Sequence, residues 1–565
     1  MSFDRTQAER SRLASEVYLG PRPPRGSDLS VCLVYPNTYR VGMANLGFQS
    51  VFGILAGAGI AVERAFLPDE RPHGRVRSLE TERPLADFDV IAFSISFETD
   101  YVHVLDILAA AGLPLWREQR GPRTPLVVAG GPATFLNPEP IAEFVDLFLI
   151  GEGEEMVPEW LAAVRAARRG GRAEMLEASS AIEGAYLPAR WPGFGSAGAT
   201  GVTPPRVRRR YVARLDDAPT RSLFLTPEAV FGDMFLVEAS RGCEWGCRFC
   251  AAGYMYRPVR HRSTASLRED VVENALPHRS TVGLVGAEMA SHPGIAALCH
   301  EIADRGGRAS PSSLKADIVS ESLAGALGKG RTSSVTIAPE AGSERMRRVI
   351  NKNLTEEQIL RAADLLAGGG VGNLKLYAMI GLPTETEADV LAIAELAAKV
   401  RSRLPGGVGR ITLSINPFVP KPWTPLQWEP MEPIATLRAK ARLLKRAIAH
   451  IPNTELDFES PREAYWQTLL SRGDRRLAPL LVAVHENEGR FWPVVQRAVR
   501  EDGLGSAPSP DEYVHRRFAP EENLPWDFID HAVDKRYLLA EWRKAMLERQ
   551  TPPCDVATCH SCGAC

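Results

Sequence analysis

The stretch EASRGCEWGCRFCAAGYMYRPVR, residues 238–260, decides the fold because it places three cysteines at close spacing directly after an apolar segment. Cys243, Cys247 and Cys250 form a C-x3-C-x2-C pattern. Structural zinc sites and ordinary iron–sulfur clusters take four protein ligands, whereas this loop supplies three. Three thiolates on a cubane cluster leave one iron open to an outside ligand, and an open position indicates chemistry. The alternative is a structural zinc loop that borrows a distant fourth ligand.

The sequence around this loop predicts a series of strand–helix units over residues 231–450. Six units in series without a reversal predict a partial (β/α)6 barrel of the TIM type, whose active residues lie at the carboxyl ends of the strands. The expected strands are DMFLVEAS, TVGLVGA, SSLKAD, SSVTIAPE, NLKLYAMIGLP and ITLSINPFVP.

Residues 30–170 also alternate apolar runs with helical patterns, which predicts a doubly wound, Rossmann-like sheet and an α/β chain. Sheets of this kind bind ligands where strands end in small and polar loops, here PNTYRVGMANLG, SISFETD, GGPATF and IGEGEE. No GxGxxG motif is present in these loops, so a dinucleotide is not the favoured ligand. The expected strands are 30–36, 61–67, 89–96, 125–131 and 145–151, and the expected helices 44–57, 99–112 and 153–168.

The remaining segments lie around these two domains. Residues 1–29 form an amino-terminal extension, and residues 171–230 are rich in Gly, Pro, Ser and Arg, which predicts a linker. The run RVRRR, residues 206–210, is read as a solvated part of that linker rather than a phosphate contact. Residues 451–565 are expected to be a helical carboxyl-terminal region that ends in the cysteine-rich tail TPPCDVATCHSCGAC.

The cysteine spacing, together with Phe249 directly before the third cysteine, resembles the radical S-adenosylmethionine (SAM) superfamily. The resemblance implies that the three cysteines bind a 4Fe-4S cluster whose open iron binds SAM. It further implies that reduction of the cluster, by a donor such as flavodoxin or ferredoxin, cleaves SAM to methionine and a 5′-deoxyadenosyl radical. A shielded cluster of low potential fits thiolate ligands inside a barrel mouth.

The resemblance also implies a set of SAM-binding residues at the ends of the barrel strands. The segment LVGAEMA departs from the common family form of two glycines, Glu and Pro, because it has Gly286, Ala287, Glu288 and Met289. For Glu340 the alternative is a cap on the helix that begins near Ser343. The implied cofactor-binding residues are Phe249, Gly286, Glu288, Ser312, Lys315 and Glu340.

A doubly wound domain directly before such a core resembles the cobalamin-binding branch of the superfamily. The resemblance implies a corrinoid between the two domains, over the carboxyl ends of the sheet, where small residues let it approach the backbone. Residues 30–165 contain His73 and His103 but no Asp-x-His-x-x-Gly motif, so we expect no histidine ligand on cobalt. The expected contacts are Ser94, Ser96, Gly130, Gly131, Gly151 and Glu152.

Four cysteines of the tail form a second cluster, with spacing C-x4-C-x2-C-x2-C. Four close thiolates complete either a tetrahedral zinc site or a cubane cluster, and His560 is an alternative to one of them. A similar tail in one subfamily of cobalamin-domain radical SAM proteins favours an auxiliary iron–sulfur cluster over zinc, with redox-active or disordered thiols as the third reading. The candidate ligands are Cys554, Cys559, Cys562 and Cys565.

Composition limits the class of protein. With 45% hydrophobic and 24% charged residues the 565-residue chain is an ordinary folded protein. A formal net charge of −2 does not indicate nucleic acid as a partner. The longest apolar stretch, residues 51–62, is too short to span a membrane, and the first twenty residues lack the apolar core of a secretion signal, so we expect a cytoplasmic protein.

The resemblance implies a radical SAM enzyme that is cobalamin-dependent and methylates an unactivated carbon of a small-molecule or macromolecular substrate. A second possibility is a cobalamin-independent radical SAM enzyme that modifies RNA or protein, with the first domain binding the partner. A third, of another class, is a redox-sensing or metal-carrying iron–sulfur protein without turnover.

Overall fold

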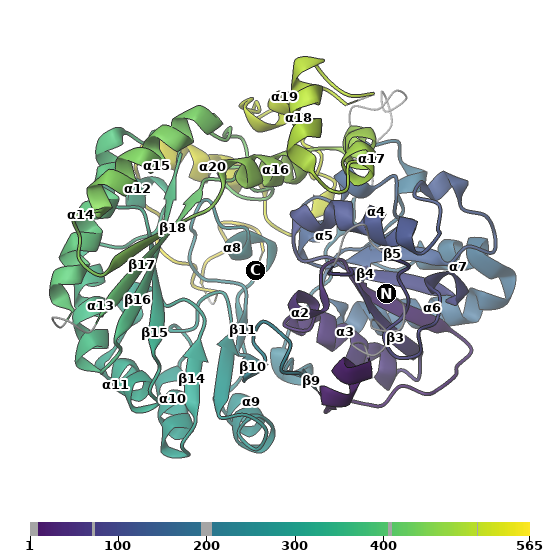
Figure 1. Ribbon diagram of the computed structural model, residues 1–565, viewed down its shortest axis with the longest axis horizontal. Coiled ribbons are helices and arrows are strands. Elements are labelled where there is room, and N and C mark those ends of the chain that lie inside the picture. Colours follow the sequence, from purple (N-terminus) through teal and green to yellow (C-terminus); the bar gives the residue numbers. More distant parts are fainter. Residues whose placement is uncertain are drawn as a thin grey trace.

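The computed structural model describes residues 10–69, 74–193, 206–404, 409–505, 507–556 and 558–564. An amino-terminal α/β domain and a larger barrel-like α/β domain stand side by side, and helices of the carboxyl-terminal region lie across one end of both (Figure 1). Among the described residues, every helix is too short or too polar to cross a lipid bilayer.

The amino-terminal domain is built on one six-stranded sheet of order β3-β2-β4-β5-β6-β7. Its first five strands are parallel, and β7 runs antiparallel to β6. The chain reverses its direction of winding between β2 and β4, and in open α/β sheets ligands bind at such a switch point. The strands are β2 (Ser30–Tyr35), β3 (Ala61–Phe66), β4 (Val90–Ser94), β5 (Leu126–Gly130), β6 (Leu147–Leu149) and β7 (Ala185–Tyr186).

Helices cover both faces of this sheet because successive side chains of a strand point to opposite sides. On β2, Val31 and Leu33 pack into one core and Cys32 and Val34 into the other. The helices α3 (Leu46–Gly57) and α6 (Gly153–Ala167) cover the first face, and α4 (Tyr101–Ala110) covers the second. The predicted strands and helices of this domain are confirmed, with ends within two residues of those expected. The shorter helices are α2 (Tyr39–Gly42), α5 (Pro132–Leu136) and α7 (Gly171–Ser179).

The second domain has seven parallel strands in two sheets, β10-β13-β14 and β15-β16-β17-β18, joined by a bridge between Leu314 and Ile337. Helices surround its outer face (Figure 1). The strands are β10 (Met234–Glu238), β13 (Thr281–Val285), β14 (Arg308–Pro311), β15 (Ser334–Glu340), β16 (Asn373–Ile380), β17 (Arg410–Pro417) and β18 (Thr454–Phe458). The helices are α9 (Thr264–Glu269), α10 (Ile295–Asp304), α11 (Glu321–Lys329), α12 (Glu344–Val349), α13 (Glu356–Gly368), α14 (Glu387–Arg403) and α15 (Ile434–Ile448).

Two expectations about this domain are wrong. The third strand is β14, residues 308–311, whereas the expected strand SSLKAD, residues 312–317, follows it and turns into a short 3-10 helix at Ala316–Ile318. The sheet also continues past residue 450, because β18 pairs with β17. The sequence TELDF of β18 alternates polar and apolar residues, as an edge strand does, and lacks the apolar run that marked the other strands.

The expected linker is partly built into the two domains, so the boundary at residue 170 is wrong. Helix α7 and strand β7 extend the first domain, β8 (Val207–Arg208) pairs with β19 (Ile529–Asp530), and β9 (Phe224–Leu225) pairs with β1 (Val17–Tyr18). The expectation of a solvated RVRRR run holds for Arg206 and Arg208, which are exposed, and is wrong for the other two arginines. Arg209 is buried, and Arg210 lies 2.8 Å from Glu159.

The carboxyl-terminal region joins the two domains. Asn137 of the first domain donates hydrogen bonds to the carbonyls of Ser471 and Gly473, and Nδ1 of His485 lies 2.6 Å from the Asp106 carboxylate on α4. These contacts hold the first domain against the end of the barrel. The helices are α16 (Pro461–Arg472), α17 (Ala478–Glu486), α18 (Phe491–Arg500), α19 (Pro510–Val514) and α20 (Lys535–Met546).

Candidate active site

The cysteine loop is held at its base by a short antiparallel pair, β11 (Ser240–Arg241) and β12 (Arg260–His261). It contains one turn of helix, α8 (Ala252–Met255). Gly242 opens the loop with a φ of +84°, and a Cβ there would lie 2.7 Å from the carbonyl oxygen of Tyr256. The close approach of these two backbones therefore requires glycine directly before the first cysteine.

The three loop thiols lie together and are largely buried. Burial raises the pKa of Cys243, and the nearby thiols of Cys247 and Cys250 raise it further. Burial raises the pKa of Cys247 to about 11, against the opposing charge of Lys352. Among the described residues, no group of three or more His, Cys, Asp or Glu side chains lies close enough together to hold a single metal ion. A cubane cluster binds each cysteine at a different iron atom, and three neighbouring buried thiols on one loop fit that requirement.

Two buried side chains fix the path of the loop. Arg248, between the second and third cysteines, donates to the carbonyls of Arg348 and Val349 at 3.0 and 2.9 Å and pairs with the Glu541 carboxylate on α20. Asn351 donates to the carbonyl of Gly246 at 3.1 Å. The loop therefore depends on α12 and α20 for its conformation.

Two lysines bring positive charge to the cysteine loop. Lys352 Nζ lies 3.5 Å from the Glu340 carboxylate. Burial alone would lower the pKa of Lys352, but the charges of Glu340 and of the three thiols raise it above its usual value. Lys315 Nζ lies 3.5 Å from the ring centroid of Trp245, inside the loop. Ammonium groups at this position offset the negative charge that three thiolates bring.

The second and third strands place three of the predicted SAM-binding residues near the loop. At Gly286 an added Cβ would lie 2.4 Å from Ser240 Oγ and 2.6 Å from Met289 Sδ, so a larger residue would displace both side chains. The Ser312 hydroxyl donates to the Gly286 carbonyl at 2.7 Å, and both carboxylate oxygens of Glu288 accept from the backbone amides of Ala290 and Ser291. Contact of these side chains with SAM stays a prediction.

Glu340 ends β15 in a left-handed conformation, with a φ of +67°, and its side chain points toward Lys352. The alternative role as a helix cap is wrong, because Ser343 caps α12 by accepting from the Met346 amide. Phe249 packs against the apolar cluster that includes Met346. The predicted contact of Phe249 with a cofactor stays a prediction.

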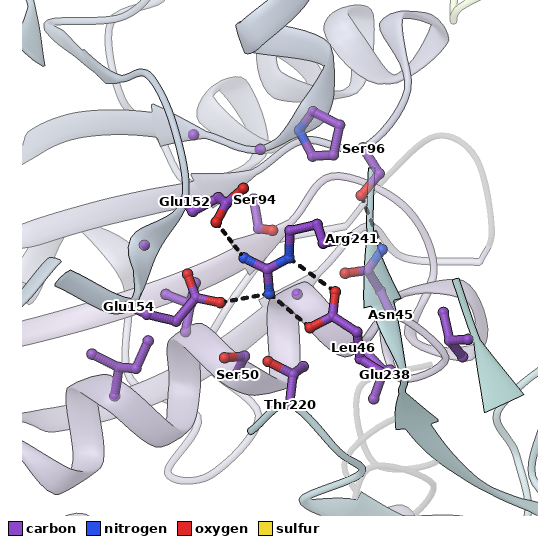
Figure 2. A pocket seen from close by; sticks show the side chains of 18 of the residues that line it. Asn45, Leu46, Ser50, Ser94, Ser96, Glu152, Glu154, Thr220, Glu238 and Arg241 are labelled. Atoms are coloured by element: carbon purple, nitrogen blue, oxygen red, sulfur yellow. Dashed lines mark hydrogen bonds and ion pairs between the residues drawn. The ribbon is translucent and has the colours of Figure 1, made fainter. Parts of the chain in front are cut away.

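A cavity of about 640 Å³ separates the carboxyl edge of the first sheet from strands β10, β13 and β14. All six residues predicted to contact a corrinoid line it, namely Ser94, Ser96, Gly130, Gly131, Gly151 and Glu152. The barrel contributes Leu236, Val285 and Ser312 to the opposite wall. Each domain therefore supplies one side of the cavity, and Figure 2 shows the polar side chains that face it.

Two of the glycines that line the cavity are required by close contacts with the protein's own backbone, which the sequence analysis did not predict. Gly131 has a φ of +105°, and a Cβ there would lie 2.5 Å from the carbonyl oxygen of Ile95. Gly151 has a φ of +132°, and a Cβ would lie 2.4 Å from the carbonyl oxygen of Arg210. Another segment of the backbone passes close to each of these two positions, so glycine is required there whether or not a ligand approaches.

Arg241 stands at the edge of the cavity among three carboxylates (Figure 2). It lies 2.8 Å from Glu152, 2.7 Å from Glu154 and 2.7 Å from Glu238. Glu152 and Glu154 begin α6 in the first domain, whereas Glu238 ends β10 in the barrel. The guanidinium therefore joins both domains two residues before Cys243.

Glu152 is an ion-pair centre rather than a free ligand. Its carboxylate lies 2.8 Å from Arg260 and 3.5 Å from Arg209 and accepts from the Val212 amide at 2.8 Å. Burial alone would raise the pKa of Glu152, but the hydrogen bond from Arg260 and the charges of Arg241 and Arg260 hold it below its usual value. Glu152 lines the cavity, as predicted, with its charge already neutralised by the protein.

No histidine is among the described residues that line the cavity. Nδ1 of His103 lies 2.9 Å from the carbonyl oxygen of Pro36, and His73 falls outside the described residues. The expectation that cobalt has no histidine ligand stays a prediction.

Sequence reasoning missed three residues of this site. Arg241 and Lys352 lie next to recognised motifs, but a single basic residue gives no signal of where its side chain points. Asn45 caps α3 by accepting from the Phe48 amide and donates to Ser96 Oγ at 3.0 Å across the cavity wall. Its position in the loop PNTYRVGMANLG, directly before a helical pattern, was a usable capping signal.

The tail cysteines lie beside the cysteine loop. The Cys554 amide donates to the carbonyl of Glu244, which follows Cys243, at 2.8 Å. Cys562 is buried, Cys559 is half-buried, and Cys565 falls outside the described residues. Metal binding by these thiols stays a prediction.

Sequence profiles of two families match the two domains. The family described as "Radical SAM proteins, N-terminal" matches residues 47–188, and the family "Radical SAM superfamily" matches residues 237–397. The second match contains all three loop cysteines. The chain belongs to the radical SAM superfamily. It is therefore a radical SAM enzyme, and membership of the superfamily implies a 4Fe-4S cluster and SAM as cofactors.

Two curated relatives and one solved structure extend this result. The chain is 29% identical over 458 residues to "Uncharacterized protein MJ0966" of Methanocaldococcus jannaschii, covering 80% of this chain and 90% of that protein. It is 29% identical over 235 residues to the hopanoid C-3 methylase of Methylococcus capsulatus, covering 40% of this chain and 39% of that enzyme.

The structure of the radical SAM methyltransferase TsrM from Kitasatospora setae, with cobalamin and a [4Fe-4S] cluster bound, is similar with a TM-score of 0.53 at 14% identity. The similarity covers 83% of this chain and 99% of that one. The two proteins share a fold.

Proposed function

We propose that this radical SAM enzyme is cobalamin-dependent and methylates an unactivated carbon. The observation that carries the proposal is the cavity of about 640 Å³ between the sheet edge and the barrel. Cavities of this size hold a sizeable ligand, and a doubly wound sheet binds ligands at this edge. When bound, the cluster and SAM together supply a 5′-deoxyadenosyl radical, and cobalamin supplies a methyl group.

The lining of the cavity suits a large ligand that has both apolar and polar parts. Apolar side chains from both domains form most of the wall, and Ser50, Ser94 and Ser96 add hydroxyl groups on the side of the first domain. The charged residues Glu152 and Arg241 neutralise each other, so the cavity does not present an unpaired charge from this pair. Such a wall binds a ligand by area and by hydrogen bonds rather than by net charge.

Residues near the loop have separate tasks in this proposal. Ser312 lines the cavity and also bonds to Gly286 near the loop, so it stands between the two halves of the site. Lys352 and Lys315 hold positive charge near the thiols. Methyl transfer is supported by the similarity to the hopanoid C-3 methylase, which is named for that reaction.

Cobalt retention tests the cofactor. The protein is purified without oxygen, reconstituted with iron, sulfide and hydroxocobalamin, and analysed for cobalt after gel filtration. We expect about one cobalt per chain in the natural protein and a loss of at least tenfold in Ser94→Trp, because the indole fills the cavity. Ser402→Trp is the matched control, since Ser402 is exposed on α14. Equal cobalt in the natural protein and Ser94→Trp, with both folded, contradicts the proposal.

Two further measurements separate the parts of the proposal. Incubation with SAM and dithionite should yield 5′-deoxyadenosine, and Cys247→Ala should abolish it whether or not cobalt is present. The electron paramagnetic resonance spectrum of bound cob(II)alamin should lack nitrogen superhyperfine coupling from a protein imidazole. Such coupling would show a histidine ligand and contradict the expectation drawn from the missing Asp-x-His-x-x-Gly motif.

A further inference from the structure

The backbone of the carboxyl-terminal tail forms hydrogen bonds with the cysteine loop and with Asn351, which supports the loop. Besides the bond from Cys554 to Glu244, the Thr551 amide donates to Asn351 Oδ1 at 2.8 Å. Arg248 donates to the carbonyl of Arg549 at 2.7 Å. These hydrogen bonds hold the tail in place as far as its first cysteine, Cys554.

The three described tail thiols are linked by a contact and by a shared neighbour. Cys559 hydrogen bonds with Cys554, and the Cys559 amide donates to the carbonyl of Asp555 at 2.8 Å. Cys562 is 1% exposed, and its carbonyl accepts from the Asp534 amide at the start of α20. The Arg257 guanidinium interacts electrostatically with both Cys559 and Cys562. Cys559 therefore lies beside Cys554, and Arg257 is a neighbour of both Cys559 and Cys562.

Arg257 is a buried cation without a carboxylate partner. It is 4% exposed, and no ion pair within the described part of the chain joins it to an Asp or Glu. Its Nε donates to the Gly253 carbonyl, and its guanidinium lies 4.9 Å from the ring centroid of Tyr254 and 5.5 Å from that of Tyr537. Burial of an unpaired charge is costly, so an anion is expected beside it.

Cysteine ligands of a metal centre carry negative charge, and two of the tail thiols are neighbours of Arg257. We propose that Cys554, Cys559 and Cys562 are ligands of a second metal centre, packed against the loop of the first and faced by Arg257. No group of three or more side chains among the described residues could hold a single metal ion, whereas an iron–sulfur cluster binds each cysteine at a different iron atom. The centre is therefore an iron–sulfur cluster, which is anionic with thiolate ligands, and the exposed His560 is the candidate for the fourth ligand within the described part of the tail.

Metal analysis of two matched variants tests the second centre apart from catalysis. One variant removes the loop thiols (Cys243→Ala, Cys247→Ala, Cys250→Ala), and the other removes tail thiols (Cys559→Ala, Cys562→Ala). Each is purified without oxygen and analysed for iron, sulfide and zinc. We expect the natural protein to hold about eight irons with sulfide and each variant to retain about four, because each variant keeps one of the two clusters.

About one zinc without iron in the loop variant would overturn the assignment of the second centre to an iron–sulfur cluster. A folded loop variant that retains neither metal overturns the proposal. So does a disulfide between tail cysteines in the anaerobic protein, seen as a loss of 2 Da by mass spectrometry. Ser561→Ala is the control for changes in the tail that leave the thiols intact. Circular dichroism establishes that each variant is folded.

The charge of Arg257 gives a second readout. Arg257→Met should release the tail metal to a chelator at least tenfold faster than the natural protein, and Arg257→Lys should restore part of the retention. Equal release rates in all three proteins, with circular dichroism unchanged, would mean that Arg257 does not face a metal centre. Neither measurement depends on SAM cleavage or on cobalamin, so failure here leaves the proposed function untouched.

Discussion

The guanidinium of Arg241 lies 2.8 Å from the carboxylate of Glu152, so the residue two places before the first loop cysteine is held by the amino-terminal domain. The same carboxylate lies 2.8 Å from Arg260, on the strand that closes the loop. Arg241 and Arg260 face each other across the β11–β12 pair. Both ends of the cysteine loop therefore meet one buried carboxylate of the other domain.

Glu152→Gln is expected to destabilise the protein by about 3 kcal/mol, because it leaves buried arginines without their shared anion. The amide retains the shape of the carboxylate, so the loss reflects charge rather than packing. The free energy of unfolding in urea is the measurement, with the rate of iron loss to a chelator as a second readout of the loop.

Glu154→Gln is the matched control for this substitution. Glu154 meets Arg241 at 2.7 Å but has no second arginine in the described structure, and its side chain is more exposed than that of Glu152. We expect a cost below about 1 kcal/mol. Equal costs for the two substitutions would mean that Glu152 is not the central anion of the interface.

The effect of Glu152→Gln should depend on pH. Arg260 and Arg241 hold the pKa of Glu152 below the ordinary value of 4.5, so the unfolded chain binds the proton first as the pH falls. The free energy that the Glu152 carboxylate contributes to folding is fully present above pH 4.5. It is lost as the pH falls through the lower pKa that Glu152 has in the folded protein. The difference between natural protein and variant should therefore be constant near neutral pH and shrink below 4.5. A constant difference down to acid pH contradicts this assignment.

Gly131→Ala tests whether the backbone at the edge of the cavity requires glycine at this position. A Cβ at Gly131 meets a backbone carbonyl at 2.5 Å and forces an alanine to a φ of +105°, so we expect a cost of at least about 2 kcal/mol. The neighbouring Gly130→Ala is the control, because its Cβ would lie 3.4 Å from the Leu149 carbonyl oxygen. Urea unfolding of the two variants should differ clearly, and equal midpoints would remove the backbone argument.

Local patterns predicted the parts of the structure that depend on neighbours in sequence. The spacing of Cys243, Cys247 and Cys250 singled out the loop, and apolar runs located the strands of the first sheet. The small residues at the ends of those strands pointed to the cavity. Each of these signals lies within a few residues of the feature that it predicts.

The sequence did not predict contacts between distant segments. Glu152 meets arginines at positions 209, 241 and 260, and nothing near Glu152 in the sequence indicates them. For the same reason Gly131 and Gly151 were assigned to a ligand, although each is required by a backbone far along the chain or across a strand end. Edge strand β18 was missed because its outer face is polar.

Lys352 and Glu340 are expected to shift the potential of the cluster in opposite directions. Lys352→Gln removes a positive charge near the three thiols, which favours the oxidised cluster and lowers its reduction potential by tens of millivolts. Glu340→Gln removes the negative charge 3.5 Å from Lys352 and should raise the potential. Redox titration followed by electron paramagnetic resonance measures both. Shifts of the same sign in the two variants would contradict this arrangement of charge.

Asn351→Ala is expected to loosen the cysteine loop from the tail. Asn351 is fully buried, donates to the Gly246 carbonyl and accepts from the Thr551 amide, so alanine leaves two buried groups unpaired at a cost of about 2 kcal/mol. Asn353→Ala is the control, because Asn353 has a similar φ and its side chain donates one hydrogen bond to the tail, to the Thr551 carbonyl. The loss of iron to a chelator should be faster in Asn351→Ala than in Asn353→Ala. If the two variants lose iron at the same rate, the link through Asn351 does not hold the loop.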